Sequence, residues 1–188
     1  MKAILISIKP KWCELIASGK KTVEVRKTKP KLETPFKVYI YCTKGETVYL
    51  PRDVMGNEAL NGKVIGEFVC RQTYESGWIL SPDHPDWEDG FDDESCLTDR
   101  ELYEYSNGGT FYGWHISDPV IYDEPIELWE FYREGNPNDR FYDDYCSGCP
   151  HHETPISEFP CNKCHGNRNY LYSPPQTWCY VEELEDRR

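Results

Sequence analysis

Four cysteines stand in two pairs with the spacing of a metal site. Cys146 and Cys149 form one Cys-x-x-Cys pair, and Cys161 and Cys164 form a second after eleven intervening residues. Two residues between cysteines allow both thiolates to bind one tetrahedral ion, and the second pair completes the tetrahedron. The segment between the pairs is too short and too polar for a core of its own, so we expect a structural zinc ion to order it.

Histidines beside these cysteines leave the set of zinc ligands open. His151, His152 and His165 flank the pairs, and any one of them could replace a cysteine in a Cys3His site. The alternative is that all three are exposed loop residues. A catalytic zinc needs an open coordination position, whereas four available thiolates indicate a closed, structural site.

A second group of reactive side chains lies near the N-terminus, in residues 19–26. Their alternation predicts a strand with Thr22, Glu24 and Arg26 on one face. A glycine lets the chain turn sharply from a preceding helix, which places Lys21 beside this row. Cations, a carboxylate and a hydroxyl together suit a ligand with a phosphate and a base edge, because Arg or Lys binds phosphate and Glu accepts from an exocyclic amine.

The charge distribution restricts which nucleic acids could bind. The chain has a net charge of -12, which argues against long nucleic acids, because affinity for phosphate comes mostly from Lys and Arg. Residues 1–31 nevertheless hold nine basic and two acidic residues, a local charge of +7 that leaves -19 for the remainder. We therefore expect a local basic face for a small anionic ligand and no extended DNA track, with a solvated Lys-rich face as the alternative.

The elements that must position these residues are mostly strands. Apolar, β-branched and alternating runs predict strands over 3–8, 22–27, 37–42, 63–70, 113–122 and 175–184. We expect a break at Pro119 within the fifth run, and residues 125–132 fit a strand or a helix equally well. Pro10 suits the first turn of a short helix, and a T-x-x-E capping box at Thr98 predicts the start of another.

Composition and length indicate the class of protein. At 188 residues with 38% hydrophobic content, the chain suits one domain with embellishments. No run of 18 apolar residues occurs, and the N-terminal apolar stretch is too short for a secretory signal, so we expect a cytoplasmic protein without a membrane partner. The odd count of nine cysteines favours a reducing compartment with one metal site over a disulfide framework.

The N-terminal group resembles the hallmark of the ASCH (activating signal cointegrator homology) family. Its G-x-K-x-x-E-x-R pattern is matched by Gly19, Lys21, Glu24 and Arg26, and the segments SIKP, GWHISDPVIYDEP and PPQTWCYVEEL are also similar to members of the family. The resemblance covers residues 1–132 and 173–184 and leaves the cysteine unit outside it.

The resemblance implies an α+β fold, a PUA-like mixed β-barrel with flanking short helices. It divides the chain into a barrel over 1–134, a zinc-binding insertion over 135–172, and a final barrel strand and tail over 173–188. It also implies a basic cleft beside the motif that binds RNA or a modified nucleotide. The ligand-binding residues expected there are Lys9, Trp12, Lys21, Glu24, Arg26, Tyr41 and Trp178, with the aromatic residues as stacking surfaces or, alternatively, as core.

Two other functions stay open. Some ASCH proteins are amidohydrolases that act on N4-acetylcytidine through a lysine, a threonine two residues before the motif arginine, and a later glutamate. Here Lys21 and Glu67 match, but Glu24 holds the threonine position, with Thr22 on the same strand face. Glu67 shares a predicted strand face with Ile65, so it is either at an edge or buried beside a partner. The third possibility is a protein-interaction surface on the zinc unit.

Overall fold

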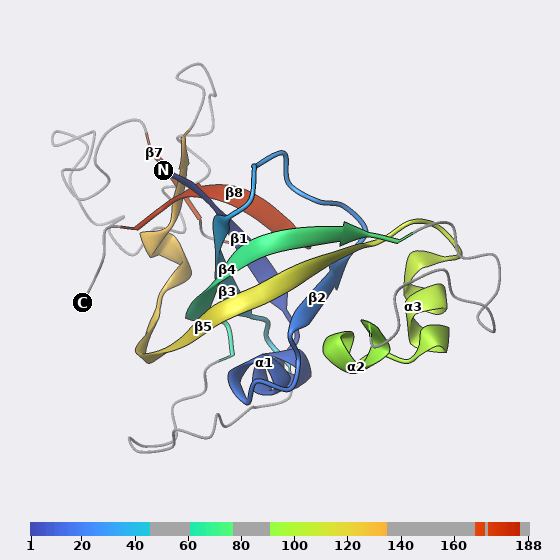
Figure 1. Ribbon diagram of the computed structural model, residues 1–188. Helices are drawn as coiled ribbons and strands as arrows, with labels where there is room; N and C mark the ends of the chain where they lie inside the picture. Colours follow the sequence, from blue (N-terminus) through green and yellow to red (C-terminus); the bar gives the residue numbers. More distant parts are fainter. Residues whose placement is uncertain (46–60, 77–90, 135–167, 172, 185–188) are drawn as a thin grey trace, which may run out of the picture.

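The computed structural model describes residues 1–45, 61–76, 91–134, 168–171 and 173–184 (Figure 1). The predicted zinc ligands Cys146, Cys149, Cys161 and Cys164 lie outside these ranges, as do the neighbouring histidines His151, His152 and His165. None of the five cysteines within these ranges forms a disulfide; they are Cys13, Cys42, Cys70, Cys96 and Cys179. Among the described residues, no helix has the length and apolar character to cross a membrane.

A six-stranded mixed sheet curves into a half-barrel and forms the body of the molecule (Figure 1). Its strand order is β2-β5-β4-β3-β1-β8; β1 pairs in parallel with β3, and the other pairs are antiparallel. The six strands are β1 (Lys2–Ile8), β2 (Val23–Arg26), β3 (Phe36–Cys42), β4 (Val64–Glu75), β5 (Tyr112–Ile126) and β8 (Trp178–Glu182). The expected α+β, PUA-like fold is confirmed.

Short helices and a small ribbon surround the sheet. The helices are α1 (Pro10–Ala17), α2 (Phe91–Ser95), α3 (Asp99–Ser106) and the 3-10 turn η1 (Leu128–Glu130). The ribbon pairs β6 (Tyr132–Glu134) with β7 (Arg168–Tyr170), so strands before the first and after the last of the four predicted zinc ligands lie side by side. The segment 125–132, ambiguous in sequence, is divided among the end of β5, η1 and the start of β6.

The helix ends follow the sequence signals closely. Pro10 occupies the first turn of α1, where its missing N–H costs nothing. Thr98 caps α3 by accepting from the backbone of Glu101, whose carboxylate accepts in return from the backbone of Thr98, so the predicted capping box is confirmed.

Bulges in β4 and β5 correct two sequence predictions. β5 runs on through Pro119 without the predicted break, because the pairing register shifts there and Asp118 adopts a left-handed φ of 50°. A second shift lies at Gly66, where an added Cβ would stand 2.3 Å from the carbonyl oxygen of Val120. This bulge breaks the alternation of β4, so Glu67 does not share a face with Ile65, contrary to the prediction.

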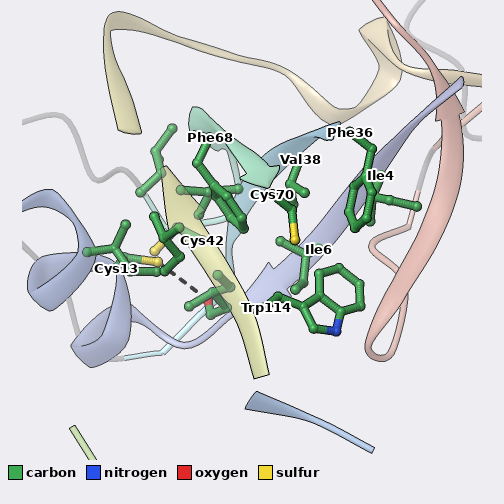
Figure 2. Packing of buried hydrophobic residues seen from close by; sticks show 14 residues of the cluster. Ile4, Ile6, Cys13, Phe36, Val38, Cys42, Phe68, Cys70 and Trp114 are labelled. Atoms are coloured by element: carbon green, nitrogen blue, oxygen red, sulfur yellow. Dashed lines mark hydrogen bonds between the residues drawn. The ribbon is translucent and has the colours of Figure 1, made fainter. Parts of the chain in front are cut away.

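Apolar side chains fill both faces of the sheet. One cluster, between α1 and the inner face, contains Ile4, Ile6, Phe68 and Trp114; Figure 2 also shows the sulfurs of Cys13 and Cys42 lying next to each other there. A second cluster on the other face gathers under η1, β6 and β8. A third packs β2 against α2 and α3 through Val23, Val25, Phe91, Leu102 and Phe111.

Candidate functional site

The alternation of β2 determines where the motif residues point. Val23 and Val25 face α2 and α3, where burial of their side chains fixes the register. Glu24 and Arg26 therefore point to the opposite side, and Glu24 stands directly across from Trp114 of β5. Because Trp114 belongs to the inner core cluster, the motif side chains of β2 face the inside of the half-barrel.

Lys21, Glu24 and Arg26 form one buried ionic network, the motif cluster. The Glu24 carboxylate lies between the two cations, with Lys21 Nζ 3.6 Å from Oε2 and Arg26 Nη2 2.8 Å from Oε1. The exposed fractions are only 2% for Lys21, 6% for Glu24 and 9% for Arg26. Buried charges need partners of opposite sign and further hydrogen bonds, and this cluster has both.

Backbone carbonyls and a hydroxyl from distant segments complete the cluster. Lys21 Nζ donates to the carbonyl oxygen of Ser95, at the end of α2, over 2.5 Å. Arg26 Nη2 donates to the carbonyl oxygen of Ser7 over 2.7 Å, and Arg26 Nη1 donates to Thr177 Oγ1 over 3.3 Å. The motif arginine thus joins β2 to β1 and to the residue before β8, which closes the open side of the half-barrel.

The surroundings of Lys21 change its protonation equilibrium. Burial lowers the pKa of the Lys21 ammonium, and the negative charge of Glu24 acts in the opposite direction. The half-buried ring of Trp12 lies nearby, with its centroid 5.1 Å from Lys21 Nζ and 4.3 Å from Lys11 Nζ. Trp12, predicted as a stacking residue, therefore lies beside the motif cluster.

Two buried donors beside the cluster have no hydrogen-bond partner among the described residues. They are Arg26 Nε and Trp114 Nε1. Both groups can only donate, so the inside of the half-barrel offers N–H groups that only an acceptor could satisfy.

The sequence also predicts Lys9, Trp178 and Thr22 as residues that matter for the site. Lys9 is exposed at the N-terminal end of α1. Trp178 is half-buried, with its ring centroid 5.8 Å from that of Trp114 and its Nε1 donating to Thr28 Oγ1 over 3.1 Å. Thr22 precedes β2, and its backbone N–H donates to Glu94.

Tyr41 and Glu67 lie on the other face of the sheet, away from the motif cluster. Tyr41 is buried in the second core cluster, 3% exposed. Glu67 accepts a 2.6 Å hydrogen bond from the hydroxyl of Tyr122 and lies 3.3 Å from Lys37 Nζ. The predicted grouping of Lys21 with Glu67 is therefore not present in this structure.

Sequence reasoning missed Ser95 and Trp114 as neighbours of the motif. Ser95 contributes only its backbone carbonyl, which leaves no signal in a side-chain pattern. Trp114 belongs to a predicted strand, and its position opposite Glu24 depends on how that strand pairs with β2. Trp114 could have been suggested as a neighbour of Glu24 only by pairing the aromatic position of one predicted strand with the charged position of the other.

Comparisons with known proteins agree with this architecture. The family model described as ASCH domain matches residues 6–96. Among solved structures, a serine-to-alanine variant of the ASCH protein from Zymomonas mobilis matches with a TM-score of 0.54 at 19% identity, covering 96% of this chain and 89% of that chain. The unmodified Zymomonas mobilis ASCH protein gives a TM-score of 0.52 at 19% identity, covering 96% and 88%.

A tyrosine-to-phenylalanine variant of the same protein gives a TM-score of 0.53 at 19% identity, covering 97% of this chain and 92% of that chain. A search of curated protein sequences finds no significant match. At this identity the structural likeness concerns the fold, whereas the family model matches the residues that form β1 to α2, the motif among them. Residues 6–96 are therefore similar to the ASCH domain, and they include the three side chains of the motif cluster.

Proposed function

We propose that this protein binds RNA or a modified nucleotide at the motif cluster. The observation that carries the proposal is the buried arrangement of Lys21, Glu24 and Arg26, which has two cations for one carboxylate. The formal surplus of one positive charge suits an anionic group of a ligand, and Arg26 can offer its unpartnered Nε. Trp12, beside Lys21, and Trp178, beside Trp114, supply aromatic surfaces for a base.

A panel of nucleosides and nucleotides, measured by isothermal titration calorimetry, tests this proposal. We expect a nucleotide to bind more tightly than its nucleoside, because the phosphate interacts with the surplus charge. Arg26→Ala should weaken nucleotide binding by about 1.5 to 3 kcal/mol if it removes one charged hydrogen bond. Affinity should fall with salt along a shallow slope, since a ligand with one or two phosphates releases few counterions.

The matched control for Arg26→Ala is Arg71→Ala. Arg71 is an exposed arginine of β4 that forms a surface ion pair with Asp118 of β5 at 2.7 Å. We expect this variant to bind as the unmodified protein does. Unchanged nucleotide affinity in Arg26→Ala, or an equal loss in Arg71→Ala, would contradict the proposed site.

Hydrolysis of an N4-acylated cytidine is the second candidate function. The observation in its favour is the buried Lys21 ammonium, whose pKa is lowered by burial, a shift in the direction that proton transfer by a lysine requires. Glu67 lies on the other face, so Thr22 and Glu24 are the groups left to assist Lys21. Incubation with N4-acetylcytidine decides the point: turnover that is lost in Lys21→Ala would establish an enzyme.

We also propose one structural zinc ion per chain, from the spacing of Cys146, Cys149, Cys161 and Cys164. Metal analysis of the purified protein should give a zinc-to-protein ratio near one, falling on Cys146→Ser. A ratio near zero would refute the proposal. Chelation should leave the half-barrel folded, because its apolar clusters are formed, apart from Leu171, by residues outside the insertion.

A further inference from the structure

Exposed lysines and aromatic rings adjoin the motif cluster where the chain leaves β2. Residues 27–31 hold three lysines and no acid, in a protein with a net charge of -12. Lys27, Lys29 and Lys31 are all exposed. They follow Arg26, the last residue of β2, directly along the chain.

Two of these lysines lie over tyrosine rings. Lys27 Nζ is 5.3 Å from the ring centroid of Tyr105, which is 38% exposed at the C-terminal part of α3. Lys29 Nζ is 5.1 Å from the ring centroid of Tyr112, the residue that pairs with Arg26 across β2 and β5. Each pair therefore combines an ammonium group with an aromatic face beside the motif arginine.

Residues of β8 hold the same segment from its other side. Trp178 Nε1 donates to Thr28 Oγ1 over 3.1 Å, and the backbone N–H of Lys31 donates to the hydroxyl of Tyr180 over 2.8 Å. These bonds hold the segment at the side chain of Thr28 and the backbone of Lys31, while its lysine side chains stay exposed. A segment held in this way loses little order when its ammonium groups bind phosphates.

We propose that residues 27–31, with Tyr105 and Tyr112, form a binding surface for single-stranded RNA that extends from the motif cluster. The inference rests on the proposed function and names its ligand as a short strand, not a free mononucleotide. Each lysine would leave its tyrosine ring for a phosphate, and a base would stack on the ring of Tyr105, which is 38% exposed. The exchange is favourable because base stacking on an aromatic ring is worth more than an exposed cation–π contact.

The competing interactions of these lysines are weak. Lys29 lies 3.6 Å from Glu75, and both side chains are about half exposed, so solvent screens the pair. A strand phosphate that replaces Glu75 as the partner of Lys29 also releases counterions, which a carboxylate on the protein does not. The surface therefore favours a polyanion whose charges alternate with flat, stackable groups.

Fluorescence anisotropy with labelled hexauridylate, and with uridine monophosphate as competitor, tests the inference on the full-length protein. We expect hexauridylate to bind at least tenfold more tightly than the mononucleotide. The salt slope for hexauridylate should be steeper by about 0.7 for each lysine that contacts a phosphate. The double variant Lys27→Ala, Lys29→Ala should remove this advantage and leave mononucleotide binding unchanged.

Substitutions at Tyr105 separate stacking from charge. Tyr105→Ala should weaken hexauridylate binding about tenfold, whereas Tyr105→Phe keeps the ring and should bind normally. Lys2→Ala removes an exposed lysine from the far end of β1 and serves as the control with no expected effect.

The outcomes distinguish this inference from the proposed function. Equal affinity for hexauridylate and mononucleotide would overturn the inference and leave the motif cluster as a nucleotide site. Polyglutamate that displaces the labelled hexauridylate as effectively as unlabelled hexauridylate does would also overturn the inference. The surface would then recognise charge alone. If neither uridine ligand binds, and no member of the wider nucleotide panel binds, the proposed function itself would be refuted.

Discussion

Two ionic clusters lie on opposite faces of one sheet and differ mainly in burial. In the motif cluster, Glu24 bonds Lys21 and Arg26, and the three side chains are 2% to 11% exposed. In the second, here named the Glu67 cluster, Lys37 lies 3.3 Å from Glu67 and 3.2 Å from Glu183, with side chains 20% to 24% exposed. In each cluster one ion contacts two of opposite charge.

The difference in burial changes what each cluster does for the fold. Ions at the Glu67 cluster keep part of their hydration, so forming the pairs costs little and contributes little. The motif cluster has lost its water, and well-packed apolar residues of similar volume would be as stable or more so. A costly buried cluster beside unpartnered donors is consistent with a binding role, whereas the Glu67 cluster needs no function beyond surface packing.

The largest expected effect comes from breaking the motif cluster at its centre. Glu24→Gln would leave Lys21 and Arg26 buried without a counter-charge, and removing one partner of such a cluster costs about 3 to 5 kcal/mol. Urea denaturation followed by tryptophan fluorescence should show a lower free energy of unfolding by this amount. A loss below about 1 kcal/mol would mean that water reaches the two cations.

The same substitution on the other face should have a much smaller effect. Glu67→Gln removes the pair with Lys37 but can still accept from the Tyr122 hydroxyl through its amide oxygen. We expect a loss of about 0.5 to 1 kcal/mol by the same denaturation measurement. A loss as large as that of Glu24→Gln would show that burial does not explain the difference between the clusters.

Replacing the whole motif cluster should separate stability from binding. The triple variant Lys21→Met, Glu24→Leu, Arg26→Met exchanges three ions for apolar side chains and should lie within about 1 kcal/mol of the unmodified protein. Nucleotide binding should nevertheless be lost in calorimetry. Retained binding in a folded triple variant would place the ligand elsewhere on the molecule.

The smallest expected effect is a dependence of stability on pH. Burial lowers the folded-state pKa of Lys21 below its unfolded value of 10.5, so the unfolded chain binds more protons in the interval between the two. The contribution of Lys21 to stability therefore increases as the pH rises towards 10.5. The difference in unfolding free energy between the unmodified protein and Lys21→Met should grow in favour of the lysine protein over this interval.

The two proteins must be compared because other buried groups change the pH dependence of stability in the opposite direction to Lys21. Burial raises the pKa of Tyr39 and of Cys70 to about 12, so both groups lower stability as the unfolded chain loses their protons above their ordinary values. Tyr39 and Cys70 are present in the unmodified protein and in Lys21→Met, so their contributions cancel when the two unfolding free energies are subtracted. A constant difference across alkaline pH would show that Lys21 keeps its ordinary pKa in the folded state.

The local parts of the fold could be predicted from sequence, and the long-range parts could not. The alternation of residues 22–27, the position of Pro10 and the capping box at Thr98 are short-range patterns, and each has its expected structure. The bulge at Gly66 depends on the close approach of the Val120 carbonyl from another strand, and it reversed the expected face of Glu67.

The motif cluster shows the same division. Its three side chains follow from one strand and one turn, so their convergence was predictable. Their burial and their partners were not, because the Ser95 and Ser7 carbonyls reach the cluster through the packing of α2 and the curvature of the sheet. Sequence spacing identified the chemical groups, and tertiary contacts determined how far solvent is excluded from them.

The hydrogen bond from Arg26 to Thr177 has a consequence for the order of events during synthesis. Its two residues are separated by 151 positions, and β8, which follows Thr177, pairs with β1 at the other end of the chain. A ribosome that makes the chain from the N-terminus delivers Arg26 long before Thr177 and Trp178. Until then one edge of β1 has no partner strand and the arginine lacks one of its anchors, so the motif cluster is completed only once β8 has emerged.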